Sequence, residues 1–408
     1  MDVVYPRCAG LDVHQKTVVV CARVAAGARV QREVHTFGTT TGELLALAEW
    51  LAARALTHVA MESTGVYWKP VWHVLEGQCE LVLANAMHIR NMPGRKSDVN
   101  DATWIADLLA HGLIRGSFVP PAPIQELRDL TRTRKQLVRE IGRHTLRLQK
   151  TLEDANVKLT GLLSDVLGKS GRAILAALVA GETDPARLAA LTGGRLKASR
   201  AELVAALQGR VTAHHRFMLQ LHLTQIAALE AAVQELDARL EAALAPFRAV
   251  VDRLITIPGV SQVVARVLVA EIGPDLSRFP TAGHLVSWAG LCPRLHESAG
   301  KRLSTRVRPG TPWLKTTLVQ AAWAAVRTKG SYLQAQFLRL KSRRGPKKAI
   351  IAVAASMLTA VYYMLTRAVP YHDLGAAHFE RRDHTKLAQR LVRRLRDLGF
   401  TVALQPAA

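Results

Sequence analysis

The chain has 408 residues, and 49% of them are hydrophobic, which is enough for two or three folded domains and excludes wholesale disorder. Its 55 lysines and arginines outnumber 32 acidic residues, so the formal net charge is +23. This excess indicates a polyanionic partner, either nucleic acid or an anionic membrane surface.

The four cysteines lie far apart and form no Cys-x-x-Cys motif. Their spacing argues against a structural zinc site and against a disulfide framework, and it is typical of a reducing compartment. The first ten residues do not read as a signal peptide. We therefore expect a cytoplasmic protein.

Residues 1–120 are predicted to form an α/β domain. Three runs rich in β-branched residues predict an antiparallel meander, at 8–13, 17–24 and 30–37. The segments that follow are predicted as a helix at 41–54, a strand at 57–61, a helix at 66–75, a strand at 80–84 and a helix that begins near residue 98. This order of elements is that of the RNase H-like fold.

Four acidic residues stand at three places in that order. Asp12 lies in the first predicted strand, and Glu62 lies at the end of the fourth. Asp98 and Asp101 lie one turn apart at the start of the last helix. In an RNase H-like fold these places meet at one edge of the sheet. Because a hard divalent cation removes the repulsion between neighbouring carboxylates, the sequence predicts a site for Mg2+ (or Mn2+) that acts on phosphodiester bonds.

Residues 121–245 are predicted to be a helical, coiled-coil region. A long helix is expected at 124–159, and a more regular heptad runs from Leu219 to Leu240, which we expect to pack against the first helix or another protomer. Cations recur every three or four residues on the first helix. Five of them are predicted to contact a nucleic-acid backbone: Arg128, Arg132, Lys135, Arg139 and Arg143. The alternative is the solvated face of a coiled coil.

Two motifs stand out in residues 246–370. The turn IPGV is similar to a helix-hairpin-helix turn, in which Gly259 would face a phosphate; the alternative is an ordinary turn. Ser298 is a candidate nucleophile, and the alternative is a DNA-contact loop with an incidental serine. The residues around it that are predicted to bind nucleic acid are Lys301, Arg302, Arg306 and Arg308.

The apolar segment at 349–366 has the minimum length for a membrane span, and we expect it to be a buried core helix, with no membrane as partner. Residues 371–408 are expected to form a basic tail that serves non-specific binding.

Five motifs occur in a fixed order: GLDVHQK, MESTGVYW, GRKSDVNDATWIADLLAHGLI, IPGV and GLCPRLHESAGK. In combination they resemble the Piv-type transposases of insertion-sequence family one-ten, over about residues 5–115 and 250–345. The resemblance implies a RuvC-like domain with a DEDD acid set at Asp12, Glu62, Asp98 and Asp101, then a coiled coil and a mainly α-helical transposase domain with Ser298 as nucleophile. The family's SSGG-like loop reads ESAG here, so Glu297 and Ala299 depart from it.

The resemblance also implies partners: donor and target DNA, a structured guide RNA from the element, and a homo-oligomer (dimer or tetramer) whose protomers share one active site. The resulting hypothesis is excision and site-specific insertion of a mobile element by DNA strand exchange. Three alternatives remain: a RuvC-like, magnesium-dependent structure-specific nuclease without a covalent serine intermediate, an actin-like ATP-binding module, and a non-catalytic architectural binder.

Overall fold

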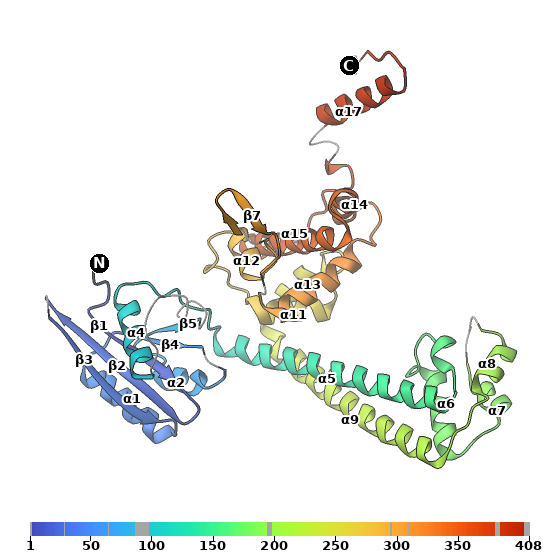
Figure 1. Ribbon diagram of the computed structural model, residues 1–408, viewed down its shortest axis with the longest axis horizontal. Helices are drawn as coiled ribbons and strands as arrows, with labels where there is room; N and C mark the ends of the chain where they lie inside the picture. The colour runs from blue at the N-terminus through green and yellow to red at the C-terminus, as the bar shows by residue number, and fades with distance from the viewer. Residues whose placement is uncertain are drawn as a thin grey trace. The chain divides into compact units, whose positions relative to one another are not determined.

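The computed structural model describes residues 2–27, 29–63, 65–85, 98–193, 198–293, 296–308, 310–379 and 384–403. The chain divides into two compact units, Met1–Pro120 and Pro121–Ala408. The first is an α/β unit and the second is mostly helical (Figure 1). This layout confirms the predicted α/β domain followed by helical regions.

A five-stranded mixed sheet forms the first unit. The meander is β1 (Arg7–Val13), β2 (Thr17–Ala26) and β3 (Arg29–Gly38), and its strands are antiparallel. β4 (His58–Glu62) and β5 (Glu80–Ala84) add parallel to β1, so the strand order is β3-β2-β1-β4-β5. The helices of this unit are α1 (Thr41–Ala53), α2 (Trp68–Leu75) and α4 (Asp98–Ala110).

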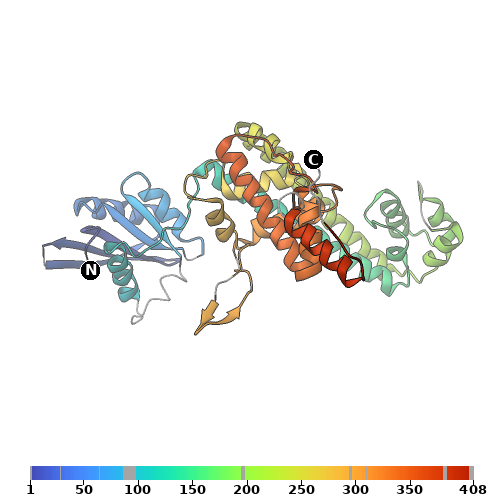
Figure 2. The same ribbon diagram turned by 90° about the horizontal axis from the view of Figure 1, so that it is seen from above.

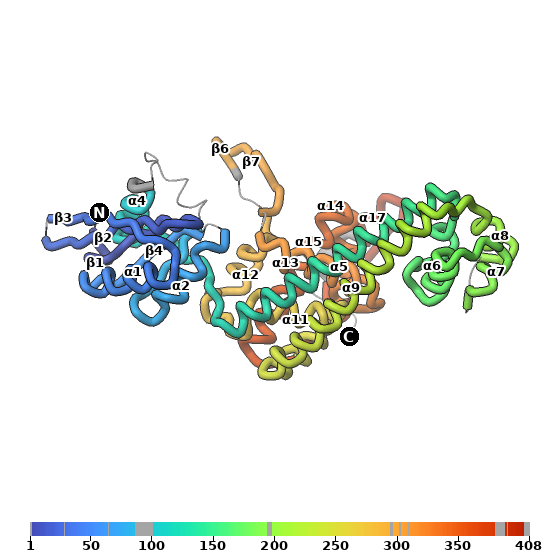
Figure 3. The backbone as a smooth tube through the Cα atoms, turned by 90° about the horizontal axis from the view of Figure 1, so that it is seen from below, coloured from blue at the N-terminus to red at the C-terminus, as the bar shows by residue number. Residues whose placement is uncertain are grey.

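The two faces of this sheet are covered by different helices (Figure 3). Leu11 and Met61 point to the side of α1 and α2, where they join a core with Leu47. Cys8 and Ala60 point to the other side, where they contact Ile105 of α4. Since side chains alternate along a strand, Asp12 and Glu62 lie on the α4 side.

α4 lies unusually close to β1, and a glycine permits that approach. A Cβ added to Gly10 would lie 2.3 Å from the Ala102 carbonyl oxygen and 2.3 Å from the Ala106 nitrogen. Both alanines are fully buried. The helix also packs on β2, where Val19 and Cys21 meet the same alanines. A side chain at Gly10 would therefore have to push α4 away from the sheet.

We expect Gly10→Ala to lower the free energy of unfolding by about 3 kcal/mol or more, because the clash is with backbone that cannot rotate away. Gly42→Ala is the matched control, since a Cβ at Gly42 meets nothing within 4 Å. Urea unfolding measures both variants. Equal stability of the two variants would contradict the close packing of α4 on β1 at Gly10.

Two long antiparallel helices begin the second unit. α5 (Ala122–Asp154) and α9 (Ala213–Ala243) pack along each other. Leu148 shares a core with Leu219 at one end, and Ile124 shares a core with Leu240 at the other. The segments between them cover the first of these ends: η1 (Leu159–Gly161), α6 (Lys169–Ala180), α7 (Pro185–Ala190) and α8 (Arg200–Leu207).

Polar pairs interrupt the apolar seam between α5 and α9. Arg134 donates to both carboxylate oxygens of Asp237, at 2.6 and 2.9 Å. Nδ1 of His144 lies 3.3 Å from Nδ1 of the buried His222. The hydrogen bonds from Arg134 lower the pKa of Asp237. The ionised form of this carboxyl therefore stabilises the folded state.

The lowered pKa sets a pH dependence. Above the ordinary pKa of 3.8 the Arg134 pair contributes its full stabilisation, and this contribution is lost as pH falls through the depressed folded-state value. Asp237→Asn should therefore destabilise the protein near neutral pH and lose that effect in acid. Urea unfolding of both proteins across this range measures the difference. A difference that grows on acidification would contradict the assignment.

The rest of this unit is a helical body. Its first elements are η2 (Ala245–Phe247), α10 (Arg248–Ile255), α11 (Gln262–Ile272) and α12 (Ala282–Trp288). A hairpin of β6 (His296–Ser298) and β7 (Lys301–Ser304) follows. The last helices are α13 (Pro312–Ala325), α14 (Tyr332–Arg344), α15 (Pro346–Arg367) and α17 (His384–Asp397).

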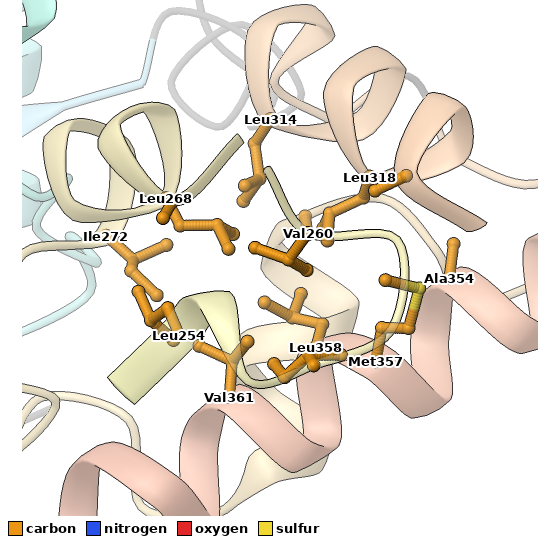
Figure 4. Close-up of a cluster of buried hydrophobic side chains, with 14 of the residues drawn as sticks. Leu254, Val260, Leu268, Ile272, Leu314, Leu318, Ala354, Met357, Leu358 and Val361 are labelled. Carbon is orange, nitrogen blue, oxygen red and sulfur yellow. The ribbon is translucent and has the colours of Figure 1, made fainter. Parts of the chain in front are cut away.

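α15 lies at the centre of this body. Among the described residues it is the one helix long and apolar enough to cross a membrane by length and composition alone. Figure 4 shows Met357, Leu358 and Val361 of α15 pointing toward Leu254 and Val260. These side chains are at most 5% exposed. The structure therefore places α15 as a core helix, as its composition predicts.

Candidate active site and nucleic-acid surface

Asp12 and Glu62 lie on neighbouring parallel strands. The register pairs Leu11 with Met61, so the two acids are the next residues along β1 and β4. Asp12 is 8% exposed, and Nε2 of His14 lies 3.0 Å from its Oδ2. Glu62 is half-buried at the end of β4. The structure thus brings these two predicted site residues to one place on the α4 face.

The direction of α4 brings its first turn to the same place. The carbonyl oxygen of Ala110 accepts hydrogen bonds from the Val4 and Tyr5 amides, so the helix runs antiparallel to β1. From Gly10 to Asp12 the strand advances about 6.6 Å. From Ala102 back to Asp98 the helix advances about 6 Å. The backbone of Asp98 therefore reaches the level of Asp12.

Asp101 is half-buried in that first turn, whereas the side chain of Asp98 lies outside the described residues. Among the side chains that are described, no group of three or more metal-ligating residues is assembled. The chemistry of the donor set nevertheless fits a hard cation, because Asp12, Glu62 and Asp101 supply carboxylate oxygens. The nearby thiols do not compete, since burial raises the pKa of Cys8 to about 11 and also raises that of Cys21.

A second ion-pair cluster holds α4 on the sheet. Asp107 accepts a hydrogen bond of 2.9 Å from Arg23 Nε and another of 2.9 Å from Arg32 Nη2. Arg23 is only 3% exposed. Sequence reasoning missed this cluster and the contact of His14 with Asp12. The available signals were an arginine inside an apolar strand and the same-face spacing of Asp12 and His14.

Ser298 lies at the tip of the β6–β7 hairpin, which projects from the helical body (Figure 2). Lys301 is its partner across the strands, so the two side chains share a face. Ala299 and Gly300 form the turn, with φ of 47° and 72°. Both values are typical of a two-residue turn of type I′. Ala299 therefore occupies a backbone conformation that favours glycine.

The root of this hairpin is fastened by two glycines with positive φ. A Cβ added to Gly290 would lie 2.7 Å from the Gly310 Cα, and one added to Gly310 would lie 2.5 Å from the Ala289 carbonyl oxygen. Pro293 and Val307 form an isolated bridge beside them. The two ends of the hairpin segment are thus held together by backbone contact.

We expect Gly290→Ala to loosen this root, at a cost of about 1–3 kcal/mol in backbone strain. Hydrogen exchange of residues 296–308 should become faster. Gly283→Ala is the control, because an added Cβ there meets only the Thr281 hydroxyl, at 3.4 Å. Unchanged exchange in the Gly290 variant would contradict a fastened root.

The cationic stripe of α5 is partly engaged by the helical body. Arg128 donates to the main-chain carbonyls of Ala270 and Glu271, and burial lowers its pKa to about 10. Arg132 donates to both oxygens of the Glu271 carboxylate, at 2.8 and 2.9 Å, and Glu271 is 1% exposed. These two side chains therefore tie α5 to the end of α11.

The remaining predicted contacts differ in surroundings. Lys135 donates to the hydroxyls of Thr316 and Thr317, at 2.6 and 3.3 Å. Arg139 is exposed, and Arg143 is exposed and paired with Glu140. Several further predicted residues lie on the hairpin segment: Lys301, Arg306 and Arg308 are partly or fully exposed, and the side chain of Arg302 lies outside the described residues.

Gly259 has a packing reason for being glycine. Its φ is 81°, and an added Cβ would lie 2.4 Å from the Ala321 carbonyl oxygen of α13. Val260 beside it is buried in the core (Figure 4). The turn thus joins α10 to α11 while it contacts α13, and this contact requires a glycine; phosphate binding at Gly259 stays a prediction.

Comparison with known proteins gives two matched segments that together cover more than half of the chain. Residues 9–157 match the model for DEDD transposases of the IS110 type, described as "Transposase", and residues 251–338 match a model described as "Transposase IS116/IS110/IS902 family". A Sinorhizobium fredii (strain NBRC 101917 / NGR234) protein named as a transposase, y4pF/y4sB, is 31% identical over 126 residues. That segment is 30% of this chain and 32% of the relative, so the match spans about a third of the relative's length.

Proposed function

The chain belongs to the IS110 family of transposases, a family that cleaves and rejoins DNA, and we propose that it does so with acids on its α/β unit and a serine on its helical unit. The observation that best supports the role of the acids is that Asp12 and Glu62 lie side by side on the sheet face that α4 covers. The fold that these features fit is RuvC-like.

Asp12, Glu62, Asp98 and Asp101 are the residues that would hold Mg2+ or Mn2+. When bound, the ion supplies Lewis-acid polarisation of a phosphodiester. The protein's own contribution is to hold the carboxylates in place before substrate arrives. His14 orients Asp12 through its 3.0 Å contact. Arg23 and Arg32 hold α4 against the sheet through Asp107, so the first turn of that helix cannot slide along β1.

Ser298 supplies the nucleophile in this proposal. Its hydroxyl oxygen bonds to phosphorus, the bond from phosphorus to one deoxyribose oxygen breaks, and the hydroxyl proton ends on that leaving oxygen. The phosphoserine ester keeps the energy of the broken bond, so a strand's hydroxyl can reverse the reaction and rejoin DNA. Lys301, on the same face of the hairpin, stabilises the negative charge of the phosphate.

A structured guide RNA and a homo-oligomer complete the proposal. Base pairing with RNA would take over the reading of target and donor sequences, so the protein needs only backbone contacts. The exposed tip of the hairpin supports a shared site, because Ser298 is accessible to a neighbouring protomer's acids.

The test is covalent trapping on a plasmid that carries the element ends and a target. We expect a denaturation-resistant protein–DNA adduct at Ser298, which Ser298→Ala abolishes with a loss of strand transfer of about 1,000-fold or more. Ser304→Ala, in the same hairpin, is the matched control and should keep both. Mass spectrometry of the adduct peptide identifies the serine.

The opposite result has a specific meaning. Magnesium-dependent cleavage by Ser298→Ala at the wild-type rate, with free hydroxyl and phosphate ends, would contradict the serine step. It would favour the structure-specific nuclease that uses water as the nucleophile.

A further inference from the structure

Three cations of α5 surround one indole ring. Trp313 lies in the first turn of α13, and its ring centre is 5.7 Å from the Arg132 guanidinium carbon, 5.7 Å from Lys135 Nζ and 5.6 Å from the Arg139 guanidinium carbon. The spacing of these cations, at i, i+3 and i+7, places them on one side of α5. The ring is half-buried, so part of it remains open to solvent.

The positive charge around this ring is only partly balanced. Glu271 neutralises Arg132. Lys135 is met by neutral threonine hydroxyls, and within the described part of the chain Arg139 forms no hydrogen bond or ion pair. Burial lowers the pKa of Lys135, the repulsion from the neighbouring Arg139 lowers it further, and the negative charge of Glu271 partly offsets these effects. An anion bound here would relieve that repulsion.

Apart from Glu271, the segment that carries Trp313 offers no acid to do so. Residues 298–372 contain no Asp or Glu; they run from the hairpin turn through α13, α14 and α15, and the acid of the hairpin is the exposed Glu297 on β6. An ordinary solvated surface mixes both signs of charge. Arg306 and Arg308 are exposed on the segment that leads from β7 to α13, and Lys315 Nζ holds that segment by donating to the Arg308 carbonyl, at 2.9 Å. The positive surface therefore continues from the Ser298 hairpin to Trp313.

Arg139 is the exposed cation of this group, and Lys135 and Trp313 are half-buried beside it. A flat aromatic ring beside exposed cations is the arrangement that binds unpaired nucleotides, since the bases stack on the ring while the phosphates meet the cations.

We infer that Trp313, Lys135 and Arg139 form a binding site for one unpaired stretch of DNA, with a base stacked on the indole and the flanking phosphates at the two cations. The inference rests on the proposed serine chemistry for the choice of DNA, because the segment that carries Ser298 leads directly into α13. It assigns Trp313 to hold the strand next to the phosphodiester under attack. A guide RNA at this place is the competing occupant.

Affinity measurements with the full-length protein test this site. The probe is fluorescein-labelled oligodeoxythymidylate of about 20 nucleotides, followed by anisotropy. We expect Trp313→Ala to raise Kd about 10-fold and Trp313→Phe to raise it less. Arg139→Gln should weaken binding and reduce the salt dependence by about one phosphate contact. Trp323→Ala, an exposed tryptophan on the same helix, is the matched control and should bind as the wild type does.

Photochemical cross-linking separates contact from folding. The same oligonucleotide with 5-bromodeoxyuridine should cross-link to the peptide that contains Trp313, in the wild type and equally in Ser298→Ala. Unchanged affinity in both Trp313 variants, or a cross-link confined to other peptides, would overturn the site. Cross-linking at Trp313 by an RNA of matching sequence but not by DNA would overturn the choice of DNA. Because these readouts need no catalysis, they stand or fall separately from the serine step.

Discussion

The close contact between α4 and Gly10 is the constraint on which the α/β unit depends. Because Gly10 has no side chain, Ala102 and Ala106 can rest directly on the β1 backbone. Strand alternation then puts Asp12 on the face that the helix covers, and the helix direction brings Asp98 to its level. The backbone of Asp98 is thus brought level with Asp12 by a packing feature that lies two residues from Asp12 along β1.

The same logic applies to the hairpin that carries Ser298. Its tip is exposed and could not be positioned by core packing. Instead, Gly290 and Gly310 let two backbone segments touch at its root, and Lys315 holds the outgoing segment. A nucleophile at the tip of such a hairpin is accessible to a large substrate, while the root of the hairpin stays fixed to the helical body. The proposed acids and the proposed nucleophile are thus both positioned by glycines that permit close backbone approach.

Much of the α/β unit could be predicted from local pattern. β-Branched runs and turn residues predicted the meander and the strand at 80–84. The positions of the acids predicted that β1, β4 and the last helix of this unit lie close together. The long-range partners could not be predicted in this way. Nothing local to Arg132 points to Glu271, which lies far along the chain, although a single acid within the apolar run of α11 is a sign of a buried cation partner. The position of the α5 cations beside Trp313 could not be predicted for the same reason, since Trp313 lies on another helix.

The charge of the helical unit has two distinct uses. Arg128, Arg132 and Arg134 are occupied with holding α5 against α11 and α9. Lys135, Arg139 and the hairpin cations take no part in those ion pairs, and we propose that they bind polyanions. Tertiary contacts therefore divide a stripe that looks continuous in sequence into residues that bind acids or main-chain carbonyls of other helices and residues that do not.

Binding of Mn2+ by the full-length protein tests the central claim most directly, because Mn2+ is followed by its own paramagnetic signal and needs no DNA. The four-acid set predicts that Asp12→Asn, Glu62→Gln, Asp98→Asn and Asp101→Asn each weaken Mn2+ binding about 10-fold or more, whereas the exposed Glu49→Gln on α1 does not. Wild-type affinity in the Asp98 and Asp101 variants would show that the first turn of α4 is not part of a metal site, and it would contradict the account.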